Sequence, residues 1–372
     1  MRAYTPFALE EFMSRFEQDV DINLTESGVH PVTLGEFLEM SGTDPGYLYD
    51  LDLNYPHVEG IPALREAIAA IYGASPRQVL VTVGAIEANH IVTRTLVGPG
   101  DGIAVMAPNY LQIWGIARNE AADLRVFRLD PDREWALDTD SLTAATGPDI
   151  KMIAVCNPNN PTGRAMPPDE MDAVVAAAER CGAWLLADEV YRGAERIGDA
   201  ETPSFWGRSD KVIAVGSLSK AYGMPGLRIG WAVAPEPLVE EIWRRHEYTT
   251  ISASMLANHL GAIALRPDVR PRLLARTRAL IRAGFPVLEE WAASHEGMVT
   301  IKPPDAAAIA FLRYHLDVGS VDLAERIRRE RSVLVVPGTY FGVEGHLRIS
   351  FGLPHEHLSD GLSRIASVMA AN

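Results

Sequence analysis

The chain has 372 residues, of which 47% are apolar and 22% are charged, as in ordinary globular proteins. This length exceeds one small hydrophobic core, so we expect two domains or one large domain with a satellite. The net charge of −15 disfavours nucleic acid and anionic membranes as partners. Cys156 and Cys181 lack disulfide or metal-type spacing, and the sequence shows neither a signal peptide nor a membrane span, so we expect a cytoplasmic protein without a metal site.

Short apolar runs alternate with helical patterns between about residues 78 and 235. Gly, Pro or Asp bounds each run, which is typical of buried strands in a largely parallel sheet. Helical patterns at 85–96 and 168–180 lie between such runs. The alternation predicts an open α/β sheet that binds ligands at the carboxyl ends of its strands. The predicted strands are 79–83, 102–106, 124–129, 152–156, 184–187, 212–215 and 229–233.

The pattern changes after about residue 236 and predicts a smaller α+β domain. Charged helical stretches at 237–249 and 269–294 precede four short strand-like runs, at 299–302, 309–314, 333–336 and 346–351. The amphipathic stretch 7–20 precedes the sheet pattern, so we expect the first 40 or so residues to pack against this domain. We therefore predict a large domain over 41–275 and a small domain built from both ends, 1–40 and 276–372.

The strongest candidate site is the segment 216–230, Gly-Ser-Leu-Ser-Lys-Ala-Tyr-Gly-Met-Pro-Gly-Leu-Arg-Ile-Gly, which follows a predicted strand. A lysine at such a strand end, beside small residues, can lose its proton and form an imine with a carbonyl, as we expect for Lys220. Ser217, Ser219 and Arg228 suit a dianionic phosphate. A lone Ser-x-Ser-Lys is more often a solvated loop, but the whole run is harder to dismiss.

Two further strand ends carry polar groups. Asn160 lies in Asn-Pro-Asn-Asn-Pro-Thr-Gly, residues 157–163, where an Asn amide can donate to a ring oxygen, although the composition also fits a tight loop. Asp188 begins Asp-Glu-Val-Tyr, and a buried carboxylate there can keep a ring nitrogen protonated. Alone, Asp-Glu-x-Tyr is a weak signal that would usually begin a solvated helix.

Residues near two other strand ends can contact a cofactor. In the segment 83–89 a strand turns into a helix, and free backbone N–H groups at such a helix start bind phosphate. Tyr110 follows Pro-Asn at a strand end and can stack on a flat ring, or equally fill the core.

Together these segments resemble the class I and II aminotransferases, a group of fold-type I pyridoxal-phosphate (PLP) enzymes, in order and over nearly the whole chain. The resemblance implies PLP as the cofactor. Lys220 would carry PLP as an imine and move the Cα proton, and Asp188 would pair with the pyridine nitrogen. Asn160 and Tyr191 would bond the ring hydroxyl oxygen. The other cofactor-binding residues implied are Gly84, Ala85, Ile86, Ser217, Ser219 and Arg228 around the phosphate and Tyr110 over the ring.

The resemblance extends to two residues outside these segments. Tyr55, in Leu-Asn-Tyr-Pro-His-Val-Glu-Gly, matches the family tyrosine that reaches the partner subunit's phosphate. This match implies a homodimer with composite active sites. Arg348 matches the arginine that binds the substrate α-carboxylate, for which a bidentate fork is suited, and Asn160 would also face the substrate.

The segment 23–30, Asn-Leu-Thr-Glu-Ser-Gly-Val-His, departs from the Gly-Glu-Pro type loop of the family. Gly28 would let the backbone approach the substrate closely. Glu26 and His30 would add a carboxylate and an imidazole at the substrate end. Its Ser-Gly-Val-His run resembles capreomycidine synthase-like PLP enzymes, which cyclise a hydroxylated arginine by elimination and addition. His30 is as readily explained as a surface or capping residue.

The favoured function is transamination between a free amino acid and an α-keto acid, because the cofactor-binding set is complete. The alternative is a PLP lyase or cyclase in a specialised biosynthetic pathway, which the segment 25–30 suggests. The intact set of Lys220, Asp188 and Arg228 argues against a non-enzymatic ligand sensor. Because function resides in the site, the fold alone does not separate transaminase from cyclase.

Overall fold

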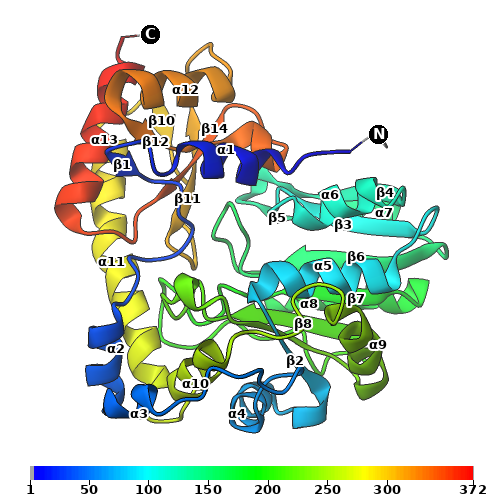
Figure 1. Ribbon diagram of the computed structural model, residues 1–372. Helices are drawn as coiled ribbons and strands as arrows, with labels where there is room; N and C mark the ends of the chain where they lie inside the picture. The colour runs from blue at the N-terminus through cyan, green and yellow to red at the C-terminus, as the bar shows by residue number, and fades with distance from the viewer. Residues whose placement is uncertain (1–3, 372) are drawn as a thin grey trace.

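The computed structural model describes residues 4–371; residues 1–3, which begin the predicted small domain, and Asn372 lie outside the described residues. Within them, a large sheet has the strand order β2-β9-β8-β7-β6-β3-β4-β5 (Figure 1). Neighbours from β4 through β3, β6 and β7 to β8 are parallel, which confirms the predicted sheet. Its strands are β2 (Val79–Thr82), β3 (Gly102–Ala107), β4 (Asp123–Asp130), β5 (Ala136–Leu137), β6 (Ile150–Cys156), β7 (Trp184–Asp188), β8 (Val212–Ser217) and β9 (Gly230–Val233).

Strand β9 runs antiparallel to both of its neighbours, β2 and β8. A parallel return would need a crossover connection, usually a helix. The segment 218–229 instead forms a loop with one 3₁₀ turn, η3 (Pro225–Leu227), so the chain re-enters the sheet in the opposite direction. This loop carries Lys220 and places it beside the end of β8.

Helices cover both faces of the large sheet, because successive strand side chains point to opposite faces. In β6, Met152 and Ala154 belong to the core beneath α5 (Gly84–Leu96), α6 (Gln112–Asn119) and α9 (Glu236–His246). Ile153 and Val155 belong to the core beneath α7 (Thr139–Ala145) and α8 (Pro168–Cys181). The strands are apolar at nearly every residue because helices bury both faces of the sheet.

A smaller antiparallel sheet has the order β10-β11-β14-β13. It comprises β10 (Val299–Thr300), β11 (Ile309–Tyr314), β14 (His346–Ser350) and β13 (Val336–Pro337) and lies near α12 (Ser320–Arg331) and α13 (His355–Met369). The predicted strand 333–336 is divided, because β12 (Val333–Leu334) pairs instead with β1 (Ile22–Asn23). This pairing brings the N-terminal segment beside C-terminal elements; the domain limits stay a prediction.

The remaining helices and 3₁₀ turns lie outside the two sheets, and α11 extends from beside the small sheet toward α10 in Figure 1. Within residues 4–371, no helix is both long and apolar enough to span a membrane. These elements are α1 (Ala8–Phe16), α2 (Leu34–Ser41), α3 (Gly46–Tyr49), α4 (Pro62–Tyr72), α10 (Met255–Ala264), α11 (Arg270–Ser294) and the 3₁₀ turns η1 (Pro76–Gln78), η2 (Pro131–Arg133) and η4 (Gly338–Phe341).

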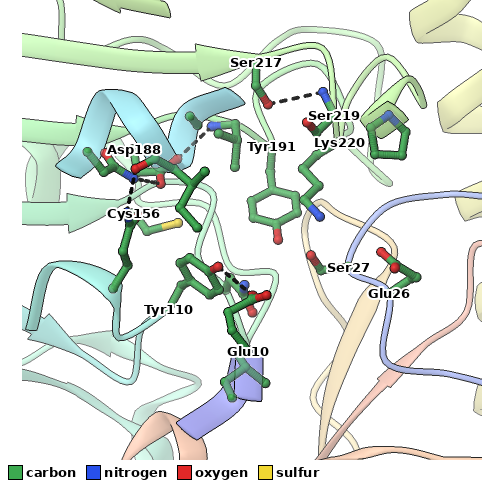
Figure 2. Close-up of a pocket in the computed structure, with 18 of the residues that line it drawn as sticks. Glu10, Glu26, Ser27, Tyr110, Cys156, Asp188, Tyr191, Ser217, Ser219 and Lys220 are labelled. Atoms are coloured by element: carbon green, nitrogen blue, oxygen red, sulfur yellow. Dashed lines mark hydrogen bonds between the residues drawn. The ribbon is translucent and has the colours of Figure 1, made fainter. Parts of the chain in front are cut away.

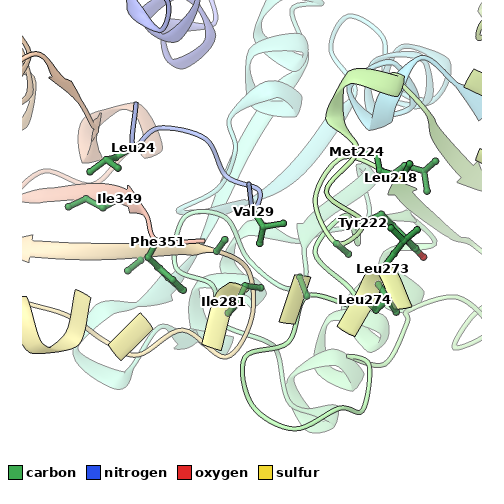
Figure 3. Packing of buried hydrophobic residues seen from close by; sticks show 14 of the residues in the cluster. Leu24, Val29, Leu218, Tyr222, Met224, Leu273, Leu274, Ile281, Ile349 and Phe351 are labelled. Carbon is green, nitrogen blue, oxygen red and sulfur yellow. The ribbon is translucent and has the colours of Figure 1, made fainter. Parts of the chain in front are cut away.

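A continuous apolar core joins the small sheet to the Lys220 loop (Figure 3). Val29 is buried in this core together with Phe351, which follows β14, and with Tyr222 of the loop. The backbone N–H of Val32 donates to the carbonyl of Gly223 at 3.0 Å. The segment 24–29 is therefore fixed against the Lys220 loop, which positions Glu26 and Ser27 at the site described next.

Candidate active site

A cavity of about 320 Å³ lies at the carboxyl ends of β6, β7 and β8 (Figure 2). Residues from both sheets and from the N-terminal helix α1 line it. This is the edge of an open α/β sheet where ligands bind. The cavity brings together most of the residues predicted from the sequence, namely Glu26, Ala85, Ile86, Tyr110, Asn160, Asp188, Tyr191, Ser217, Ser219, Lys220, Arg228 and Arg348.

Lys220 extends into the cavity from the loop after β8. Burial lowers the pKa of its amine, although the nearby Glu26 and Glu10 carboxylates act in the opposite direction. A lowered pKa favours the neutral amine, which is the nucleophilic form. Gly28 lies directly against it: a Cβ at residue 28 would sit 3.4 Å from the Ser219 carbonyl oxygen and 3.7 Å from Lys220 Cδ.

Asp188 ends β7 and is buried. Its Oδ2 accepts from Asn89 Nδ2 at 2.8 Å and its Oδ1 from the Val190 N–H at 3.2 Å. Burial raises the pKa of this carboxyl, while those two hydrogen bonds and the Lys220 charge lower it. The described residues give Asp188 no ion pair, so a cationic group entering the cavity would complete its electrostatic environment.

The start of α5 and the end of the Lys220 loop form a narrow cup. Gly84 has φ +75°, and a Cβ there would lie 2.4 Å from Arg228 Nη2. A Cβ on Gly230 would lie 2.3 Å from the Ala85 nitrogen, so β9 also requires glycine at this contact. No side chain caps α5, and the first-turn N–H groups of a helix lack intrahelical partners. With Arg228, Ser217 and Ser219 beside them, these groups suit a dianion.

Arg348 of β14 is only 2% exposed. Its Nη1 donates to Asn160 Oδ1 at 2.9 Å, and its Nη2 donates to the Thr25 carbonyl oxygen. Its Nε has no hydrogen-bond partner within the described chain. Burial lowers the pKa of this guanidinium. Arg348 lines the cavity, and a buried cation there is arranged to receive an anionic group such as a carboxylate.

Two ring hydroxyls belong to the same wall. Tyr191 is buried, and burial raises the pKa of its hydroxyl. The Tyr110 hydroxyl donates to Glu10 Oε1 at 2.6 Å (Figure 2). Burial also raises the pKa of Tyr110, and the Glu10 carboxylate raises it further. Both phenols are therefore held in their protonated, hydrogen-bond-donating form.

Sequence reasoning missed the acidic side of the cavity. Glu10 of α1 and Glu17, the C-cap residue of that helix, line it with Glu26. Burial raises the pKa of the Glu17 carboxyl, and repulsion from Glu26 and Glu10 raises it further. The periodicity of the stretch 7–20 predicted the helix, but it carries no signal that these acids meet a strand-end cavity. Asn89 and Cys156 also line the cavity and are not among the residues predicted from the sequence.

The structure does not bring His30 or Tyr55 into this cavity. His30 is exposed, whereas its neighbour Val29 is buried, and the His30 carbonyl oxygen accepts from Arg276 at 2.9 Å. The expected convergence of Glu26 and His30 is therefore absent from the described cavity wall. Tyr55 is 78% exposed and lies in a separate surface hollow with Thr250.

The fold and the site define a fold-type I PLP-dependent enzyme. Residues 51–365 match the family described as "Aminotransferase class I and II". The chain belongs to this family, and its cofactor is pyridoxal 5'-phosphate.

Three similar proteins cover nearly the whole chain. "Capreomycidine synthase" of Streptomyces vinaceus is 32% identical over 98% of this chain and 94% of its own length. A PLP-dependent aminotransferase from Streptococcus suis superposes with a TM-score of 0.93 at 30% identity, covering 100% of this chain and 99% of that one. The PLP-dependent cyclase OrfR gives a TM-score of 0.89 at 27% identity, covering 100% and 98%.

Proposed function

We propose that this protein is an aminotransferase that exchanges the amino group of a free amino acid with an α-keto acid. One observation carries the proposal: a single cavity contains the lysine Lys220, the buried carboxylate Asp188 and the buried guanidinium Arg348. These three groups suit a carbonyl carbon, a cationic ring nitrogen and a substrate carboxylate, respectively. When bound, PLP supplies an electron sink for the reacting Cα.

The other residues of the cavity would orient the cofactor and the substrate. The first turn of α5, at Gly84, Ala85 and Ile86, would bind the phosphate together with Arg228 and the two serines, Ser217 and Ser219. Tyr110 would stack on the ring, while Asn160 and Tyr191 would bond its hydroxyl oxygen. Arg348 would hold the α-carboxylate, so that the Lys220 amine can take and return the proton at Cα.

A cyclase or lyase is the second candidate, favoured by the acidic lining. Glu10, Glu17 and Glu26 face the same cavity, and clustered carboxylates raise the local concentration of cations. An amino acid with a cationic side chain would therefore be favoured. Glu26 could also transfer a proton to a leaving group. The similarity to a capreomycidine synthase and to a PLP-dependent cyclase agrees with this candidate.

Turnover without any keto acid separates the two candidates. We expect about one amino group to be removed per site, with further turnover only after a keto acid is added. The substrates are a panel of cationic, acidic and apolar amino acids, with products identified by mass spectrometry. Many turnovers without a keto acid would instead establish the cyclase or lyase.

Glu26 and His30 offer a matched pair of variants for the acidic lining. We expect Glu26→Gln to raise KM for a cationic amino acid roughly fivefold, since a solvent-screened charge pair contributes up to about 1 kcal/mol. His30→Ala should leave this KM unchanged, because the side chain is exposed outside the cavity. Equal KM values for the two variants would show that Glu26 does not contact the substrate.

We also propose a homodimer in which Tyr55 reaches the partner's cofactor. Exposed apolar side chains line the same surface hollow: Leu53 is 88% exposed and Leu256 is 40% exposed. Apolar surface of this kind marks a contact between proteins. Sedimentation at assay concentration should show a dimer, and Tyr55→Phe should weaken PLP binding. A fully active monomer would contradict the composite site.

A further inference from the structure

Glu87 contacts three parts of the chain at the base of the phosphate cup: Val83, the end of α9 and the residues 249–250. It lies in the first turn of α5 and is 8% exposed. Its Oε2 accepts from the Val83 N–H at 2.6 Å and lies 3.2 Å from His246 Nε2 at the end of α9. Its Oε1 accepts from Thr250 Oγ1 at 2.7 Å and also from Thr249 Oγ1.

This buried carboxylate is ionised. Burial raises the pKa of Glu87, but hydrogen bonds from His246, Thr249 and the Val83 N–H outweigh burial and bring the pKa to about 2. A negative charge at a helix start would ordinarily compete with a bound anion for the free N–H groups. Glu87 instead bonds the N–H of Val83, the residue before the helix, so those of Gly84, Ala85 and Ile86 are left for the anion.

The backbone of the phosphate cup has little steric freedom. The orientation of its N–H groups therefore depends on the hydrogen bonds that Glu87 makes. Gly84 adopts a left-handed φ of +75°, and Gly230 touches the backbone of residues 84 and 85. A small rotation of the Val83–Gly84 peptide would therefore re-aim the N–H groups that follow it. The same carboxylate accepts from Thr249 and Thr250, and Thr250 lines the surface hollow that contains Tyr55.

We propose that Glu87 is a positioning residue for the cofactor phosphate. It fixes the Val83–Gly84 turn so that the first-turn N–H groups of α5 face the phosphate, and it couples this turn to the segment 246–250. The inference requires only that PLP binds at this cavity and does not depend on the reaction type. A purely structural residue would stabilise the contact between α5 and α9 without affecting the phosphate.

Glu195 provides a matched control for Glu87. It is also a buried glutamate, 5% exposed, and its Oε1 accepts from the Gly193 N–H at 2.9 Å and from Thr202 Oγ1 at 3.1 Å. Its Oε2 bonds Arg278 at 2.6 Å. Glu195 bonds neither the start of α5 nor the segment 246–250, so Glu195→Gln perturbs a comparable buried network away from the phosphate cup.

The experiment compares Glu87→Gln with Glu195→Gln in the full-length protein. The dissociation constant of PLP and the ³¹P resonance of its bound phosphate are measured, with melting temperature as the structural readout. We expect Glu87→Gln to raise the PLP dissociation constant about tenfold and to shift the resonance, since charge-assisted hydrogen bonds are lost. Glu195→Gln should lower the melting temperature and leave both phosphate readouts unchanged. Equal effects of the two substitutions on PLP binding would overturn the proposal.

A milder pair decides the question if either glutamine variant fails to fold. Thr250→Val removes one hydroxyl donor from Glu87, and Thr202→Val removes one from Glu195. We expect a roughly threefold weaker binding of PLP for Thr250→Val, because Glu87 loses one hydrogen bond and keeps those from Val83 and Thr249. Thr202→Val should bind PLP as the unchanged protein does. A PLP affinity of Thr250→Val equal to that of Thr202→Val would also overturn the proposal.

Discussion

Lys220→Ala is expected to remove the covalently bound, coloured form of the cofactor and to lower kcat by at least about 100-fold. Proton transfer by a positioned side chain contributes about 10²–10⁴-fold, and the substitution removes the amine proposed for it. Burial lowers the pKa of that amine, which favours the neutral form needed for attack and for proton abstraction. Visible absorption and steady-state kinetics with the preferred amino acid measure both effects.

Lys211→Ala is the matched control for this prediction. Lys211 precedes the same strand, β8, but it is exposed, and its Nζ donates to the Gly182 carbonyl at 2.7 Å. The substitution should leave colour and kcat unchanged. If Lys220→Ala keeps the absorption of the unchanged protein, another lysine carries the cofactor.

Arg348→Lys is expected to weaken binding of the amino acid by about 10- to 150-fold, with PLP affinity unchanged. The guanidinium bridges Asn160 and the Thr25 carbonyl oxygen and retains a free Nε donor, whereas an ammonium cannot form a bidentate pair. A charge-assisted pair of this kind contributes about 1.5–3 kcal/mol. A lysine buried here would also lose its charge more readily.

Spectral titration of the holoenzyme with the amino acid measures this loss separately from cofactor affinity. Arg313→Lys is the control, because Arg313 lies on the neighbouring strand β11 and is exposed. Its titration should match that of the unchanged protein. An unaltered titration for Arg348→Lys would show that a different residue holds the carboxylate.

The strand-end part of the site was predictable because local sequence defines where buried strands stop. Asp188 ends β7, Ser217 ends β8 and Lys220 follows three residues later. Carboxyl ends of parallel strands meet at one edge of a sheet, so sequence order alone predicts that these residues converge. The antiparallel insertion of β9 was not predictable in this way, because strand direction depends on a non-local pairing.

The acidic lining of the cavity depends on tertiary packing. Tyr110 meets Glu10 from a helix about 100 residues earlier in the sequence, and helical periodicity shows which face is apolar without showing which acid meets a cavity. His30 is only four residues from Glu26, yet Glu26 lines the cavity and His30 does not. Tyr55 lies outside the cavity of its own chain, so its proposed role at a cofactor requires the proposed homodimer.

Reduction with borohydride followed by peptide mapping tests most directly whether Lys220 holds the cofactor. The sequence contains four lysines, Lys151, Lys211, Lys220 and Lys302, and the other three are exposed away from the cavity. We expect one phosphopyridoxyl label per chain, on the peptide that contains Lys220. A label on Lys151, Lys211 or Lys302 instead would contradict it.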